Sequence, residues 1–134
     1  MVIDTSAGIA ILLGESDAVQ LARVMESATV LRISAATLLE AAIVVEKRYG
    51  LAGSAKLDQF LAAADVQIEP VTAEQSTVAR AAYRKYGKGM HPAGLNFGDC
   101  FSYALAKSLG EPLLFKGDDF ALTDVSKIDM SSED

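Results

Sequence analysis

The chain opens with Met1-Val2-Ile3-Asp4-Thr5-Ser6, an apolar run that ends in an acid followed by two hydroxyl residues. Short apolar runs bounded by polar residues are typical of buried strands in a parallel sheet. In such sheets, ligands bind at the carboxyl ends of the strands. The opening therefore predicts a strand over residues 1–3, with Asp4 at an edge where a ligand site is expected.

Similar apolar runs recur along the chain and predict further strands at residues 30–33, 66–68 and 112–115, with a weaker fifth at 126–130. Longer helical stretches fill the gaps, at residues 7–13, 17–27, 35–49, 55–64, 73–86 and 97–109. No internal repeat or low-complexity linker interrupts the alternation. We therefore predict one α/β domain over residues 1–134, with helices on both faces of a parallel sheet of four or five strands.

Helix-boundary signals support this division. Three pairs have the spacing of a capping box: Asp17 with Gln20, Thr37 with Glu40, and Thr72 with Gln75. Glycines follow three of the predicted helices, at Gly50, Gly87 and Gly110, as glycines at helix C-termini do.

The composition limits the class of protein. The 134 residues are 51% hydrophobic, which excludes a disordered chain, and no apolar run approaches the roughly 20 residues of a membrane span. The single cysteine, Cys100, cannot form an internal disulfide, which fits a reducing cytoplasm, and packing in the core is its expected role. The lone His91 has no second histidine to make a zinc site.

The charge balance gives two opposing indications about nucleic acid. The net charge of −6 argues against binding RNA or DNA when taken alone. However, basic residues gather in one short segment with aromatic ones: Arg80, Arg84, Lys85 and Lys88 alternate with Tyr83 and Tyr86. Arg84, Lys85 and Lys88 are candidate RNA contacts, and a solvated helix end is the alternative reading of the segment.

Glu40 and Asp99 lie in predicted helices without a basic residue at helical spacing. The neighbours of Glu40 at three and four residues are small or apolar, and those of Asp99 are apolar or neutral polar. A carboxylate on an apolar element is costly unless something neutralises it. If folding gathers these acids with Asp4, the natural neutralising group is a hard divalent cation bound by oxygen ligands.

Each acid also has a simpler explanation. Asp4 could cap the helix that follows it, and Glu40 could be the third residue of a capping box begun by Thr37. Asp99 could be an acid in a first helical turn, opposite Asn96 as the cap. Asp118 and Asp119 could form a polar turn. These alternatives stay open residue by residue, although all of them would have to hold together.

Four stretches resemble the motifs of PIN-domain ribonucleases, and above all those of VapC-type toxins of bacterial type II toxin–antitoxin pairs. The stretches are Val2-Ile3-Asp4-Thr5-Ser6-Ala7, Ala36-Thr37-Leu38-Leu39-Glu40, Leu95-Asn96-Phe97-Gly98-Asp99-Cys100-Phe101 and Leu113-Leu114-Phe115-Lys116-Gly117-Asp118-Asp119-Phe120. They cover nearly the whole chain in the right order. The third and fourth are specific, whereas the opening Asp-Thr-Ser is weak alone.

The resemblance implies a five-stranded parallel sheet and endonucleolytic RNA cleavage that depends on Mg²⁺ or Mn²⁺. It assigns the family's acids to Asp4, Glu40 and Asp99, and a fourth acid to Asp118 or Asp119. We expect Asp4 and Asp99 to bind metal directly, and Glu40 to orient water or bind a second ion. Thr5, Ser6 and Asn96 are candidates for supporting these acids, although Asn96 could equally be only a helix cap.

The resemblance also implies a partner, an antitoxin whose C-terminal peptide lies near the acids. A homodimer is predicted as well, because the first two helices, at residues 9–13 and 19–25, carry more apolar residues than one helix face needs, although a small α/β core could absorb them. Two other functions are weighed against the ribonuclease. A phosphoacceptor receiver domain also has acids at strand ends and a late lysine, here Lys116, but it requires adjacent acids after the first strand. An inactive PIN-like module that only binds protein would not need the acids.

Overall fold

The computed structural model describes residues 1–128, and its sheet has the predicted parallel strands. They are β1 (Val2–Ile3), β2 (Arg32–Ser34), β3 (Gln67–Glu69) and β4 (Leu113–Leu114), in the order β3-β2-β1-β4. The predicted fifth strand lies partly outside the described residues. Within them, that segment contributes an isolated parallel bridge between Leu113 and Lys127.

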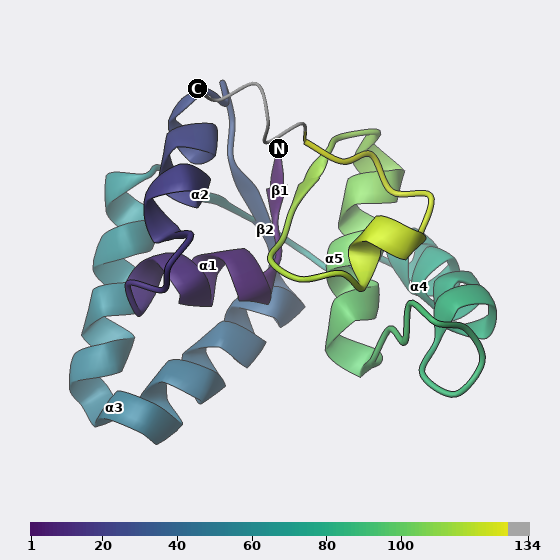
Figure 1. Cartoon of the computed structure of the whole chain (residues 1–134), viewed down its shortest axis with the longest axis horizontal. Helices are drawn as coiled ribbons and strands as arrows, with labels where there is room; N and C mark the ends of the chain where they lie inside the picture. The colour runs from purple at the N-terminus through teal and green to yellow at the C-terminus, as the bar shows by residue number, and fades with distance from the viewer. Residues whose placement is uncertain (129–134) are drawn as a thin grey trace.

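Helices cover both faces of this sheet. They are α1 (Thr5–Leu12), α2 (Ala18–Glu26), α3 (Ala35–Ala63), α4 (Ala73–Tyr86), α5 (Phe97–Leu109) and the short 3-10 helix η1 (Phe120–Leu122). In Figure 1, α1, α2 and α3 lie on one side of β1 and β2, and α4 and α5 lie on the other. The predicted three-layer α/β fold is therefore confirmed.

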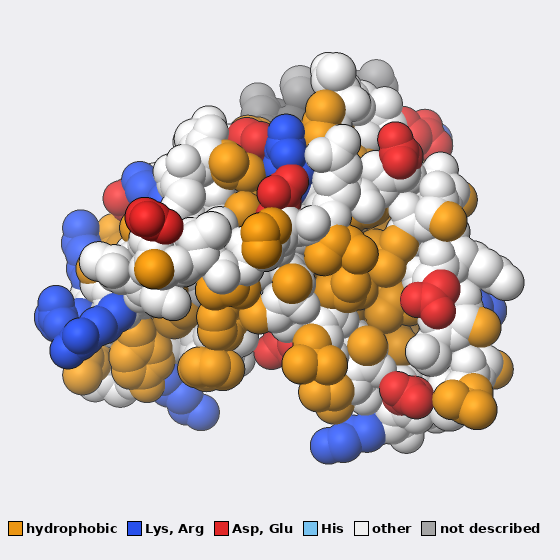
Figure 2. Space-filling view, turned by 180° about the vertical axis from the view of Figure 1, so that it is seen from behind, with side chains coloured by type: hydrophobic (Ala, Val, Ile, Leu, Met, Phe, Trp, Pro, Cys, Tyr) orange, Lys and Arg blue, Asp and Glu red, His pale blue; other side chains and the backbone are white. Residues whose placement is uncertain are grey.

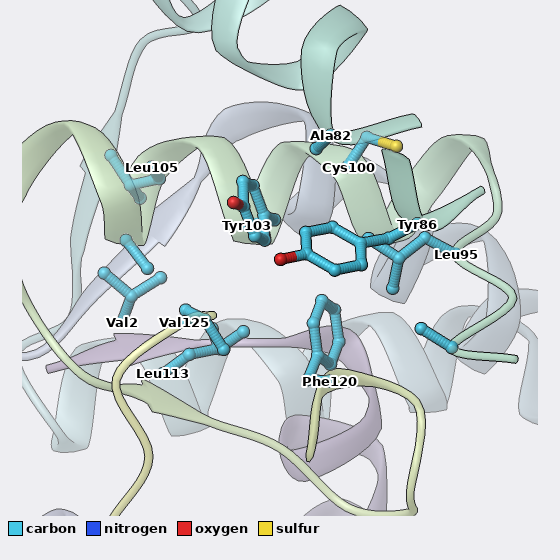
Figure 3. Close-up of a cluster of buried hydrophobic side chains, with 12 residues drawn as sticks. Val2, Ala82, Tyr86, Leu95, Cys100, Tyr103, Leu105, Leu113, Phe120 and Val125 are labelled. Atoms are coloured by element: carbon cyan, nitrogen blue, oxygen red, sulfur yellow. The ribbon is translucent and has the colours of Figure 1, made fainter. Parts of the chain in front are cut away.

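Successive side chains along each strand point to opposite faces of the sheet, so the strands contribute to a hydrophobic cluster on each face. Val2 and Leu113 belong to the cluster under α4 and α5, whereas Ile3 and Leu114 belong to the cluster under α1 and α2. Figure 3 shows the first cluster, where Tyr86, Tyr103 and Phe120 meet the strand residues. Each fully buried side chain of this size contributes roughly 1.5–3 kcal/mol by leaving water. The packing fixes the helix starts relative to the strand ends.

Two of the three expected capping boxes do not form. Helix α3 begins at Ala35, directly after β2, and its N-cap is Ser34, whose Oγ accepts a hydrogen bond from the Ala36 amide. Thr37 and Glu40 therefore lie inside α3 and form no capping box. Asp17 occupies the N-cap position of α2, but its side chain makes no capping hydrogen bond.

Other boundary predictions are confirmed. Thr72 caps α4 by accepting from the Gln75 amide, and Gly110 ends α5 in the left-handed conformation. The predicted break at Gly50 is a kink with a φ of 65°, so the two predicted helices on either side form one bent element. No helix within residues 1–128 is long and apolar enough to cross a membrane. Cys100 is buried as a free thiol.

Candidate functional site

Asp4 lies where β1 passes into α1, and its side chain is only 2% exposed. It caps α1: one carboxylate oxygen, Oδ2, accepts from the Ser6 amide at 3.0 Å and from the Ser6 hydroxyl at 2.7 Å. The other, Oδ1, accepts from the Ser102 hydroxyl at 2.6 Å. Asp4 is thus a buried carboxylate held by neutral donors, so the capping role holds without excluding a role as a ligand.

Ser102 is a site residue that sequence reasoning missed. It lies on α5, is fully buried, and its hydroxyl is 3.1 Å from that of Thr37 on α3. Ser102 therefore connects Asp4 to the helix that carries Glu40. A signal was present in the sequence, because Ser102 follows Asp99 by three residues and so shares its helix face.

Glu40 lies against the start of α5. Its Oε1 accepts a hydrogen bond from the Thr5 hydroxyl at 2.6 Å. Its carboxylate also lies so close to Gly98 that a β-carbon at position 98 would collide with it. The glycine therefore allows the carboxylate of Glu40 to approach the first turn of α5, where Asp99 is the next residue.

Asp99 lies in that first turn, opposite Asn96 as the N-cap, and the two residues form a capping box that was not predicted from the sequence. Its Oδ2 accepts from the Asn96 amide at 3.0 Å, and Asn96 Oδ1 accepts from the Asp99 amide at 2.8 Å. Burial and, to a smaller extent, the negative charges of Asp4, Asp119 and Glu40 together raise the pKa of the Asp99 carboxyl to about 6, although the hydrogen bond from the Asn96 amide lowers it. The acids therefore share one electrostatic environment.

The segment after β4 reaches the same edge of the sheet. The amide of Lys116 donates to the Ser6 hydroxyl at 2.9 Å, which ties this segment to Asp4. The Lys116 ammonium points elsewhere and pairs with Glu15 at 2.6 Å and Asp17 at 3.4 Å. Asp118 and Asp119 are both exposed, and the charge of Asp119 is one of those that act on Asp99.

None of the five acids forms an ion pair with a basic side chain in the described part of the chain. As placed, no three acidic, histidine or cysteine side chains within residues 1–128 stand close enough to ligate one ion together. Asp99 faces its own helix cap and Glu40 faces Thr5, so both side chains would have to turn. The donor set of carboxylate oxygens fits Mg²⁺ or Mn²⁺ in its chemistry.

The basic segment runs up to the start of α5. A bridge pairs Gly87 with Leu95, and the amide of Lys88 donates to the Leu95 carbonyl at 2.9 Å. Arg84, Lys85 and Lys88 are exposed, and the Lys85 ammonium lies 5.0 Å from the centre of the Tyr86 ring. Tyr86 is buried in the core, whereas Tyr83 is partly exposed.

The starts of α3 and α5 lie on either side of a depression at one edge of the molecule. Figure 2 shows this edge from behind, hollowed between the half with α3 and the half with α4 and α5, with hydrophobic side chains on both sides. Exposed apolar residues of these helices include Leu39, Ile43 and Phe97. The hollow thus lies between the half of the molecule whose helix α3 carries Glu40 and the half whose helix α5 carries Asp99.

Comparison with known proteins gives consistent matches. The family model described as PIN domain matches residues 1–126. The chain is 55% identical to "Ribonuclease VapC" of Mycolicibacterium smegmatis, over 96% of this chain and 99% of that one. It is 52% identical to "Ribonuclease VapC30" of Mycobacterium tuberculosis, over 96% of this chain and 98% of that one.

Solved structures share the fold at low sequence identity. The crystal structure of Mycobacterium tuberculosis VapC20, described as a toxin that cleaves the sarcin-ricin loop, superimposes with a TM-score of 0.77 at 19% identity, covering 95% of this chain and 97% of that one. VapBC2 from Rickettsia felis, bound to a DNA fragment from its promoter, gives 0.72 at 17% identity, covering 96% of each chain. A toxin–antitoxin complex from Klebsiella pneumoniae gives 0.68 at 18%, covering 92% of each.

Proposed function

Since the chain belongs to the PIN-domain family and is of the VapC type, we propose that it is an endoribonuclease, the toxin of a type II toxin–antitoxin pair, which hydrolyses RNA phosphodiesters with Mg²⁺ or Mn²⁺. The observation that carries the metal dependence is the group of acids at one sheet edge. Asp99 is partly buried beside the charges of Asp4, Glu40 and Asp119, and none of them has a basic partner within residues 1–128.

We assign each residue of the site a role according to its position. Asp4 and Asp99 would hold the ion, and Glu40 would orient the attacking water or help to hold a second ion. Thr5, Ser6 and Ser102 keep the carboxylates in place through the hydrogen bonds described above. When bound, the cation supplies the positive charge that stabilises the negative charge developing on the phosphate. Asp119, exposed beside this group, is the better candidate for the fourth acid than Asp118.

We propose that RNA approaches along the basic segment. Arg84, Lys85 and Lys88 are exposed, and the chain that follows them leads directly into Asn96 and Asp99. These cations would contact the RNA backbone, which an acidic protein can approach only where its site carboxylates are offset. Cleavage would leave a 3′-hydroxyl and a 5′-phosphate, with no role for the 2′-hydroxyl of the RNA.

An antitoxin is the second proposed partner. Two of the similar solved structures are described as toxin–antitoxin assemblies or VapBC pairs, which supports a partner of this kind. The apolar borders of the depression suit a peptide, and an Arg or Lys of that peptide would pair with the acids and compete with metal. Growth arrest on expression of the toxin alone, relieved by co-expression with the antitoxin, is the expected result in cells, where a cytoplasmic location is proposed.

A homodimer is also proposed, on different surfaces from those first considered. The sequence suggested that α1 and α2 carry more apolar residues than one face needs. In the structure, however, Leu21, Val24 and Met25 are buried in the core, and Val19 is the largely exposed member. Large exposed side chains are found instead on α3 and α5, at Leu39, Ile43 and Phe97. Light scattering at micromolar concentrations tests the dimer, and a monomer throughout would refute it.

The direct test of the enzyme uses purified protein and a structured RNA. Cleavage in Mg²⁺ should stop in excess EDTA and return with Mn²⁺. Asp4→Asn should abolish it while keeping the fold, since asparagine also caps helices well. Cleavage that persists in EDTA would contradict the metal dependence. A folded protein that binds an antitoxin but cleaves no RNA under any condition would favour the inactive protein-binding module.

A further inference from the structure

A pocket of about 450 Å³ lies between α4 and α5. Its walls include Arg80 and Tyr83 from α4, and Phe97, Cys100 and Phe101 from α5. Phe97 is 77% exposed although it begins the helix that carries Asp99, and Tyr83 is 40% exposed. So much aromatic surface is costly to leave in water, which makes the pocket a candidate binding surface.

The arrangement of the rings suits a flat ligand. The Phe97 ring lies edge to face with Phe101, with centroids 5.0 Å apart and planes at 84°. Phe101 is thereby held against its neighbour, and Phe97 keeps most of its surface open. Aromatic side chains that stand free beside a basic groove are the usual platforms for unstacked bases in single-stranded nucleic acid.

The charge at the rim distinguishes a nucleotide from an apolar peptide side chain. Arg80 lines the pocket, and Arg84 follows it by one helical turn. Neither forms an ion pair with a carboxylate in the described part of the chain, although the protein has a net charge of −6. In Figure 2, hydrophobic side chains on the half with α4 and α5 lie beside a group of Lys and Arg side chains. Unpaired cations at an aromatic pocket match a base with its phosphate.

Phe97, which lines the pocket, also belongs to the turn of α5 that carries Asp99. Phe97 and Asp99 occupy the same first turn of α5, and Gly98 between them touches the Glu40 carboxylate. Residues two apart on a helix point to different sides, so the pocket and Asp99 lie on different faces of this turn, and an RNA strand would pass the end of α5 to reach both. We propose that this pocket binds one unstacked base of the RNA substrate on the strand that passes the acids; the assignment rests on the proposed ribonuclease function and deepens it.

The test measures base stacking without cleavage. The probe is an oligouridine hexamer carrying one 2-aminopurine, whose fluorescence is quenched by stacking, added in EDTA to protein with Asp99→Asn so that RNA stays intact. Phe97→Leu keeps the bulk of the side chain but removes the ring. It should weaken binding by about 5- to 100-fold and abolish the quenching, whereas Phe97→Tyr should retain both. Arg80→Ala should weaken binding and lower its salt dependence.

Tyr49→Leu is the matched control, because Tyr49 is a 56% exposed aromatic residue on α3 outside this pocket, and its loss should change neither readout. Equal binding and quenching by Phe97→Leu and the parent would overturn the proposal. So would a Phe97→Leu protein that loses only dimer or antitoxin binding, since the pocket would then be a protein interface. If the protein showed no metal-dependent cleavage but Phe97-dependent quenching remained, the proposed ribonuclease activity would be refuted. The proposed base-binding pocket would not be.

Discussion

Acids lie near both ends of β1, but in the described part of the chain only those near its amino end are paired with positive charges. At the amino end, Glu111 accepts from the ammonium of Met1 at 2.6 Å and pairs with Arg32 at 3.1 Å. Arg32 also pairs with Glu69 at 2.7 Å. At the carboxyl end, Asp4 meets only the hydroxyl and amide donors of Ser6 and Ser102.

The pKa values follow this difference. Burial raises the pKa of Glu111, but the ammonium of Met1 and the guanidinium of Arg32 outweigh it and lower the pKa below its usual value. Burial and neighbouring negative charges raise the pKa of Asp99 to about 6. Acids that stabilise a fold are neutralised by the protein itself, whereas the acids of this site are left to be neutralised by a ligand.

Apart from removal of a site acid, the largest expected effect comes from Gly98→Ala, which alters only the acid-rich end. The new methyl group would collide with the Glu40 carboxylate, a flexible group that can turn away at little cost in stability. Displacing a positioning carboxylate by about 1 Å is expected to lower RNA cleavage about a hundredfold. Gly8→Ala is the matched control, because a β-carbon at this helical glycine meets nothing within 4 Å. Cleavage rates and melting temperatures of both variants check the prediction, and equal rates would contradict it.

A smaller effect is expected from Ser102→Ala. The change removes the buried donor to Asp4 Oδ1 and breaks the link to Thr37. Loss of groups that orient metal ligands typically costs 10- to 100-fold in affinity, so we expect Mg²⁺ binding to weaken by about tenfold in calorimetry. Thr37→Val keeps the Ser102 bond to Asp4 and should weaken binding less. Similar affinities in all three proteins would remove Ser102 from the site.

The contrast between Gly98 and Ser102 shows how far the sequence could predict this site. The strands and the position of Asp4 could be predicted from the sequence. Short apolar runs indicate buried strands, and the carboxyl ends of parallel strands indicate the edge where ligands bind. The motif containing Gly98 was recognised, but its contact with Glu40 joins residues 58 positions apart and depends on how α3 packs against α5. Thr37 and Glu40 looked like a capping box because their spacing fits one, but Ser34 starts the helix earlier.

The pH dependence of stability should also differ between the acids at the two ends of β1. Between about pH 4 and pH 6, folded Asp99 keeps a proton that the unfolded chain has lost, so the free energy of unfolding should fall as pH rises through this window. The effect is about 1–2 kcal/mol after solvent screening. Asp99→Asn should flatten this part of the profile in EDTA. Chemical denaturation at several pH values measures it, and parallel profiles for the two proteins would contradict the assignment.

Glu111→Gln provides the opposite control at the amino end. The pKa of Glu111 is lowered, so its stabilising contribution is present above about pH 4.5 and is lost as pH falls through the folded pKa. The variant should therefore be less stable near neutral pH by about 1 kcal/mol and lose less stability in acid. Mg²⁺ should stabilise it as much as the parent protein, whereas Asp99→Asn should gain little from Mg²⁺.

The smallest expected effect concerns charges that lie outside both ends of the strand. Lys85 and Lys88 are exposed near the start of α5, and Lys85 also lies over the Tyr86 ring. If they contact the RNA backbone, Lys85→Ala with Lys88→Ala should weaken RNA binding a fewfold and lower the slope of log K against log salt by about one to two. Metal affinity should not change, because neither lysine pairs with a site acid within residues 1–128. An unchanged salt slope would assign these lysines to a solvated helix end, where they complement the helix dipole.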